Sequence, residues 1–272
     1  MRDLDRILGV ISEARRRLLR VMLVLGPLFG FLVTFRLQIV PVSVLGVTIP
    51  LGYPVPNLFY NITAQVFHLL RDYTLPANVT IINYGVGDSV VAQLEIGALL
   101  TVILGMPWIV HEVGAFLAPA LRNNERELLR RIGIPATVLF AIGTSIGLLF
   151  LTPLTFRLLF QYVGALGLAP VLGVQDFIGF VLLYSLAFGI VFELPVFIFA
   201  LTRIGLVRAS AWRRHWRAAV LGALFFGMIV TPDNSGITML LVATPMVGLY
   251  LGGAWFAQRW ETQRARAPAA GG

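Results

Sequence analysis

The stretch Val110–Arg131 reads VHEVGAFLAPALRNNERELLRR and separates two long apolar runs. Pro119 ends the first run as a helix, because proline has no N–H to donate and its ring clashes with the preceding turn. Six of the ten residues from 122 to 131 are charged. A connection this short and this charged is typical of a loop between two membrane spans.

The composition outside this stretch is that of a membrane protein. The chain has 272 residues, of which 58% are hydrophobic and 12% charged, whereas a soluble domain carries about 25% charged residues. There is no cysteine, which excludes disulfides and thiolate metal sites. All 21 basic residues are arginine and the net charge is +8. In this class of protein such an excess faces anionic lipid and the cytoplasm rather than nucleic acid.

The apolar runs predict an all-α membrane protein with six transmembrane helices in one polytopic domain, residues 1–260. The expected spans are 18–35, 90–118, 132–160, 177–204, 218–230 and 237–257. The fifth is short, because a bilayer needs about 20 residues. Residues 3–17 place apolar residues on one helical face, which predicts an amphipathic N-terminal helix at the cytoplasmic interface.

The connections between the spans differ in their arginine content. Residues 36–88 form a mixed outer loop with two N-x-T sequons, at Asn61 and Asn78, which are weak motifs. The tail, residues 261–272, is expected to be disordered. The N-terminus through Arg20 holds six arginines. The connections 36–88, 119–131, 161–175, 203–217 and 231–236 hold two, four, none, five and none, and the residues after the last span, 258–272, hold three. Because arginine-rich connections stay in the cytoplasm, both termini are expected inside.

No catalytic pattern is present, and we expect neither an enzyme nor a metal or cofactor site. His111-Glu112 is not followed by a second histidine at zinc-helix spacing. The three histidines, His68, His111 and His215, fall at unrelated depths. There is no G-x-S-x-G and no phosphate loop.

Glu193 is the carboxylate placed well inside a span, in Glu193-Leu-Pro195. An ionisable group there costs roughly 2.5–3.5 kcal/mol on insertion, so it predicts a functional site. The alternative is a protonated, hydrogen-bonded structural residue at the Pro195 kink. Three other carboxylates lie near span ends and are expected to be solvated: Glu95, Glu112 and Asp176.

Carboxylates at the cytoplasmic face lie among arginines. Glu13 precedes Arg16 and Arg17 by one helical turn, and Glu125 precedes Arg126. Such carboxylates either neutralise their neighbours or accept the guanidinium fork of a visiting peptide. The spacing leaves both interpretations open.

Several segments together carry a family resemblance. They are SEARRRL (12–18), AFLAPAL (115–121) followed by Glu125-Arg126, Gly147 to Pro153 with Phe156, FGIVFELP (188–195), TPD (231–233) and Pro245–Tyr250. They resemble motifs of the TatC family, the receptor subunits of the twin-arginine protein translocase. The spacing to Pro245 leaves Asp233 or Asn234 as the counterpart of the family's aspartate.

The resemblance implies six spans with inner termini and short fifth and sixth spans, in the cytoplasmic membrane. It implies that Glu13 and Glu125 bind the arginine pair of a signal peptide, with Arg15, Phe116 and Arg126 shaping that face. Glu193 would contact the partner TatA, and self-association and TatB, where present, would complete the translocase. The expected structural or outer-face residues are Pro107, Pro119, Pro153, Pro195 and Asp233. Transport of folded cargo would be driven by the proton gradient.

Two other classes remain as alternatives. A proton-coupled secondary transporter would use Glu193 as its titrating group, but the two halves show no repeat and no paired broken helices. An intramembrane protease would need a nucleophile and base, and no such pair stands out.

The arginine alternation makes a topological prediction. Cysteine-accessibility tags at Arg122, Val207 and the C-terminus should report the cytoplasm, and tags near Pro56 and Gly167 the outside. The absence of native cysteine makes each introduced thiol unique. One loop on the opposite side would contradict the six-span topology.

Overall fold

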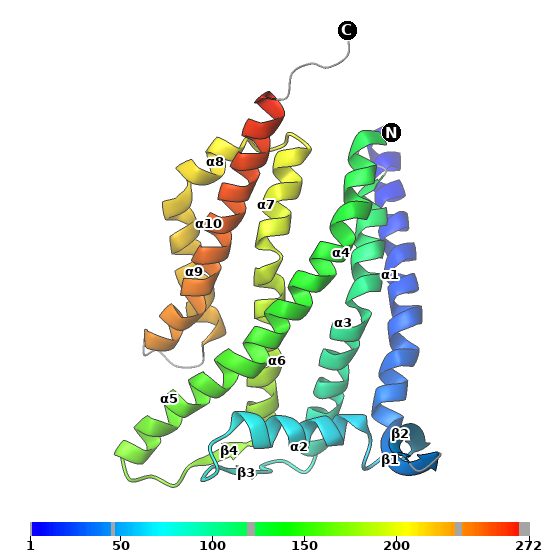
Figure 1. The fold of residues 1–272 in the computed structure, drawn as a ribbon, viewed down its shortest axis with the longest axis vertical. Coiled ribbons are helices and arrows are strands. Elements are labelled where there is room, and N and C mark those ends of the chain that lie inside the picture. The colour runs from blue at the N-terminus through cyan, green and yellow to red at the C-terminus, as the bar shows by residue number, and fades with distance from the viewer. Residues whose placement is uncertain (1, 45–46, 119–122, 232–235, 267–272) are drawn as a thin grey trace. The chain divides into compact units, whose positions relative to one another are not determined.

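The computed structural model describes residues 2–44, 47–118, 123–231 and 236–266. The elements are mostly helices (Figure 1) and group into two compact units. Unit 1 comprises Met1–Ile109 and Thr152–Leu182, and unit 2 comprises Val110–Leu151 and Leu183–Gly272. Each unit has its own buried core.

Close contact between two long helices organises unit 1. The elements in it are α1 (Arg2–Thr34), β1 (Phe35–Val44), β2 (Val47–Pro56), α2 (Ile62–Thr74), β3 (Thr80–Ile82), α5 (Thr152–Ala165), β4 (Val171–Gly173) and the first parts of α3 (Asp88–Leu117) and α6 (Val174–Phe192). A Cβ on Gly97 of α3 would lie 2.8 Å from Val33 Cγ2 of α1, and a Cβ on Gly105 would overlap Leu25. Glycine therefore lets the two helices approach as small residues do in membrane bundles.

Asn61 ties α2 to both of these helices. It is fully buried, and its Oδ1 accepts from the Ala64 N–H as the N-cap of α2. Its Nδ2 donates to the Val33 carbonyl at 2.6 Å and to Gln93 Oε1 at 3.0 Å. A buried amide with these bonds is a structural residue, and its sequon is inaccessible to a glycosylating enzyme in the folded chain.

An aromatic cluster and a small sheet complete unit 1. Phe177 of α6 is fully buried, with ring centroids 6.0 Å from Phe67 of α2 and 5.7 Å from Phe156 of α5. Strand β3 pairs in parallel with β4, with Thr80 opposite Val171. Together these contacts fix α2, α5 and the start of α6 at one end of the unit.

Unit 2 is built from α4 (Asn123–Ile146), the π-helical turn η2 (Gly147–Leu151), the rest of α6, α7 (Leu194–Arg203), α8 (Ala209–Arg214), α9 (Trp216–Val230) and α10 (Ile237–Arg266). Backbone contacts at glycine hold α4 against α6. A Cβ on Gly143 would lie 2.5 Å from the Phe188 carbonyl, and one on Gly147 would lie 2.9 Å from the Tyr184 carbonyl. No larger residue fits there without moving a helix backbone.

The last helix packs through glycine as well. A Cβ on Gly253 of α10 would lie 2.9 Å from Pro195 Cα of α7. Beyond the apolar part, Glu261 accepts a hydrogen bond from the Ala209 N–H at 3.2 Å, and Gln258 accepts one from Arg213 at 2.6 Å. Because these bonds engage α8, α10 remains helical to Arg266. Residues 261–266, which were expected to be disordered, are therefore helical, and residues 267–272 lie outside the described part of the chain.

The predicted spans correspond to observed helices. Among the described residues, five segments are long and apolar enough to cross a membrane, and the shorter α9, with 15 residues, is a sixth apolar helix. The amphipathic helix expected over 3–17 is continuous with the first span as α1. The antiparallel β1–β2 hairpin within the 36–88 loop was not expected.

The α4–α6 contact makes a stability prediction. Gly143→Ala should destabilise unit 2 by about 1–3 kcal/mol, because the new methyl overlaps the α6 backbone. Gly222→Ala on α9 is the matched control, since a Cβ there meets nothing within 4 Å. Thermal unfolding in detergent measures both. Equal melting temperatures for the two variants would contradict the close packing of α4 on α6.

Candidate functional site

The first candidate surface lies on α1 and is lined by polar and charged residues. A shallow groove of about 290 Å³ is bordered by Gly9, Ser12, Glu13, Arg16, Arg17 and Arg20. Arg17 donates to Glu13 Oε1 twice, from Nη2 at 2.7 Å and from Nε at 3.2 Å. The pair is the i,i+4 ion pair that the helical spacing allowed.

Glu13 keeps part of its surface exposed in this groove. Its side chain is 38% exposed, whereas that of Arg17 is 18% exposed. Both hydrogen bonds from Arg17 reach the same oxygen of Glu13. A carboxylate oxygen accepts more than one hydrogen bond, so Glu13 can take a further guanidinium from outside. Arg15 lies on the same helix and is exposed.

The remaining predicted binding residues belong to unit 2. Phe116 lies half-buried near the end of α3. Glu125 and Arg126 lie in the first turn of α4, and their side chains are outside the described part of the structure. Pro119 falls outside the described residues altogether. The structure thus places Glu13 and Arg15 in unit 1, and Phe116, Glu125 and Arg126 in unit 2.

Glu112 is a carboxylate that the sequence did not single out. It was expected to be solvated near the end of a span, but only 5% of it is exposed. Helix α3 continues to Leu117, so residue 112 lies inside the helix rather than at its end. Phe116 is four residues further along α3 and therefore lies on the same helical face as Glu112. This spacing is the sequence signal that could have indicated the burial of Glu112. His111 Nδ1 lies 4.0 Å from Glu112 Oε1.

Glu193 occupies the break between α6 and α7. Pro195 is the second residue of α7 and cannot donate to the turn before it, so the two helices are separate. Glu193 is half-buried, and its Oε1 is buried without a hydrogen bond from the described residues. A buried carboxylate oxygen without a donor is costly, and a polar group on a partner would stabilise it.

The other prolines and carboxylates that the sequence singled out lie in several elements. Pro107 lies inside α3, and Pro153 is buried at the start of α5, directly after η2. Asp233 is outside the described residues. Glu95 was expected to be solvated, but it is half-buried and its Oε2 is buried. Asp176 is exposed, as expected.

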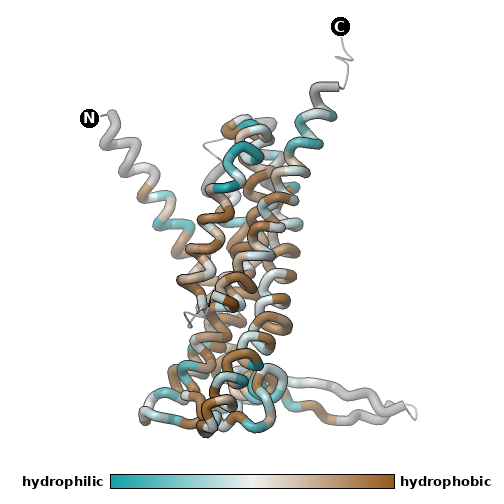
Figure 2. Tube along the Cα trace, turned by 90° about the vertical axis from the view of Figure 1, so that its left-hand side faces the viewer, coloured by the Kyte–Doolittle hydropathy of each residue, from teal (hydrophilic) through white to brown (hydrophobic). Residues whose placement is uncertain are grey.

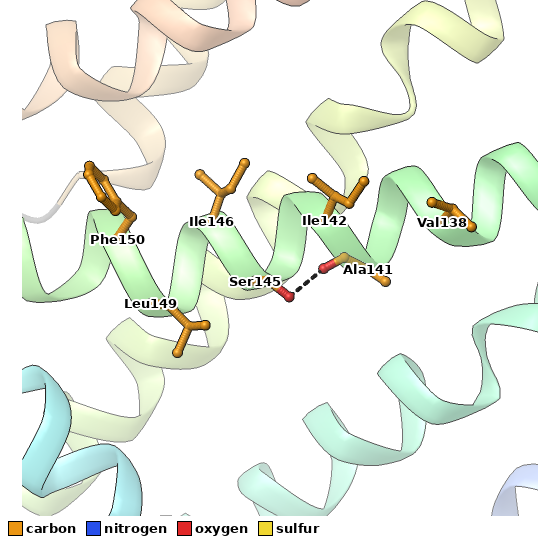
Figure 3. A pocket seen from close by; sticks show the side chains of 7 residues that line it. All are labelled: Val138, Ala141, Ile142, Ser145, Ile146, Leu149 and Phe150. Atoms are coloured by element: carbon orange, nitrogen blue, oxygen red, sulfur yellow. Dashed lines mark hydrogen bonds between the residues drawn. The ribbon is translucent and has the colours of Figure 1, made fainter.

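A second hollow, on α4, offers no polar recognition. Figure 3 shows its lining along α4 and η2: Val138, Ala141, Ile142, Ser145, Ile146, Leu149 and Phe150. The one polar side chain, Ser145, already donates to the Ala141 carbonyl at 2.7 Å. This surface suits lipid chains or an apolar helix rather than a charged peptide.

Comparison with known proteins decides the family. The family described as TatC, Sec-independent protein translocase protein, matches residues 9–245. A TatC protein of Cenarchaeum symbiosum is 40% identical over 259 residues, covering 95% of this chain and 97% of its own. The chain belongs to the TatC family. A TatC protein of Deinococcus radiodurans is 28% identical over 246 residues, covering 88% of this chain and 81% of its own.

The fold agrees with a solved TatC structure. A crystal structure of the twin-arginine translocase receptor TatC superposes with a TM-score of 0.72 at 23% identity. The match covers 93% of this chain and 99% of that chain. As a TatC protein, the chain is a multi-pass membrane component of a protein translocase and not an enzyme. Family membership therefore favours transport of proteins over the transporter and protease alternatives.

Proposed function

We propose that this TatC protein is the receptor for twin-arginine signal peptides and that Glu13 binds one guanidinium of the arginine pair. The observation that carries the proposal is the exposure of Glu13. Its carboxylate is held by Arg17, yet 38% of its side chain remains open to the groove on α1. The fold match to a twin-arginine translocase receptor supports the same function.

The arginines around Glu13 have a defined role in this proposal. Arg17 holds the carboxylate in place through its two hydrogen bonds. Arg16 and Arg20 border the same groove and raise the local positive potential. A guanidinium overcomes this repulsion by binding a carboxylate through two parallel N–H groups, and a lysine ammonium has no such fork. Selection for Arg-Arg over Lys-Lys follows from this difference in geometry.

Glu125 is the proposed second carboxylate. It lies in the first turn of α4, where the positive end of the helix dipole favours an anion. The arginine pair would then be shared between Glu13 and Glu125, with Arg15, Phe116 and Arg126 shaping the surface. The family resemblance around Ala115–Leu121 and Glu125-Arg126 supports this assignment.

The remaining steps concern partners and orientation. We propose that Glu193 receives a polar group of TatA, because its buried Oε1 has no donor among the described residues. TatB, where present, and further copies of the chain would complete the complex, and the proton gradient would drive transport. The arginine alternation supports cytoplasmic termini in the cytoplasmic membrane.

Glu13→Ala should weaken binding of a twin-arginine peptide more than ten-fold. Truncating one partner of a charge-assisted pair that the bound peptide buries costs at least about 2 kcal/mol, and about 1.4 kcal/mol corresponds to one decade in Kd. Binding is measured by fluorescence anisotropy with Arg-Arg and Lys-Lys peptides. The preference for Arg-Arg should fall together with the affinity.

The matched control for Glu13 is Asp72→Ala. Asp72 is 65% exposed and pairs with Arg71 at 2.7 Å on α2, so it loses the same kind of ion pair elsewhere. The Asp72→Ala variant should bind the twin-arginine peptide with unchanged affinity. If Glu13→Ala and Glu125→Ala together leave affinity and selectivity at the wild-type values, the carboxylates are ion-pair partners alone.

Glu193→Gln separates the two proposed sites. The amide keeps the shape of the side chain and one acceptor but removes the possibility of charge. Peptide binding should be retained, whereas recruitment of TatA, measured by crosslinking, and transport into vesicles should fall. Transport at the wild-type rate would return Glu193 to a structural role at the helix break.

A further inference from the structure

The β1–β2 hairpin is the element of unit 1 that neither the spans nor the candidate site explains. Each strand has ten residues, and they pair from Phe35 opposite Pro56 to Val44 opposite Val47. In Figure 2 the coloured base of the hairpin leaves the helices sideways. An isolated two-stranded ribbon is at best marginally stable in water, so its surroundings must supply further stabilisation.

The base of the hairpin is fixed to the helices. Gln65 of α2 accepts from the Leu37 N–H at 3.2 Å and donates to the Leu37 carbonyl at 2.9 Å. The Asn57 N–H donates to the Thr34 carbonyl at 2.8 Å, and the Phe31 and Phe35 rings stack at 4.8 Å. The ribbon therefore leaves the helix end in a direction set by these contacts rather than by a flexible linker.

The pairing register makes the ribbon edges poor sites for a third strand. Pro41 lies opposite Pro50, and neither has an N–H, so this is a non-hydrogen-bonded pair. Since the two kinds of pair alternate, the other prolines of β2, Pro54 and Pro56, also fall at positions whose backbone faces outward. The β2 edge thus lacks most of its outward donors, which disfavours strand addition by another chain and lowers the cost of leaving water.

The residues themselves are apolar. No charged residue occurs between Arg36 and Arg71. The hydrogen-bonded register positions beyond the base hold aliphatic residues only: Val40, Val42, Val44, Val47, Ile49 and Leu51. Near the base, Ile39 is 69% exposed and Tyr53 is 43% exposed. Aromatic and aliphatic groups beside a single arginine are the composition of the membrane–water interface.

We propose that the β1–β2 hairpin lies in the interfacial region of the lipid bilayer, with the face of the ribbon that carries Val40 toward the acyl chains. Three observations favour lipid over a protein partner: the β2 edge that lacks most of its outward donors, the absence of charge, and the sideways direction in which the base of the hairpin leaves the end of a membrane span. The headgroup region supplies donors for the outward carbonyls that remain. The hairpin is then a membrane contact that steadies unit 1 at this end of the spans.

Single-cysteine fluorescence tests this placement, because the full chain has no native cysteine. Val42→Cys and Ser43→Cys carry bimane labels at neighbouring positions, one in a hydrogen-bonded pair of the register and one in a non-hydrogen-bonded pair. Asp72→Cys, labelled in the same way, is the aqueous reference. In phosphatidylcholine vesicles, a nitroxide on the lipid should quench label 42 most strongly, and aqueous iodide should quench label 72 most strongly. Label 43 should fall between them.

A further variant keeps the test independent of one substitution. Val47→Cys lies at the same register parity as Val42 and should behave like it. Iodide quenching of labels 42, 43 and 47 equal to that of label 72 would place the hairpin in water and overturn the proposal. Protection of labels 42 and 47 from both quenchers would mean that protein covers the hairpin, which overturns it as well.

Discussion

The cost of placing a guanidinium in hydrocarbon organises the charged parts of this chain. Because every basic residue is an arginine, the arginine counts predict which connections stay in the cytoplasm. The same constraint gathers arginines around the carboxylates of α1 and α4. The two oxygens of a carboxylate match the geometry of a guanidinium fork.

Close packing at glycine supplies the rigidity behind this surface. Lipid gives no hydrophobic drive for helices to associate, so association depends on contact between backbones. In unit 1 Gly97 of α3 packs against the side chains of Val33 and Phe29 of α1, and in unit 2 Gly143 of α4 packs against the Phe188 carbonyl of α6. The helix that carries Glu13 and the helix whose first turn carries Glu125 each pack closely at glycine within their own unit.

The spans and the break at Glu193 were predictable from the sequence, because run length and proline chemistry act locally. The hairpin was not, because its prolines indicate a loop until the register shows that they need no N–H from the partner strand. The burial of Glu112 was missed because it depends on which face of α3 packs inside its unit. The helical end of α10 depends on Glu261 reaching α8, a contact between residues far apart in the chain.

A double-mutant cycle between receptor and peptide tests the central claim most directly. Glu13→Ala in the chain is combined with replacement of each peptide arginine in turn by lysine, and the four affinities of each cycle are measured at one salt concentration. Contact between Glu13 and one guanidinium predicts a coupling of about 1.5 kcal/mol or more for that arginine. Additivity within about 0.5 kcal/mol for both arginines would contradict it.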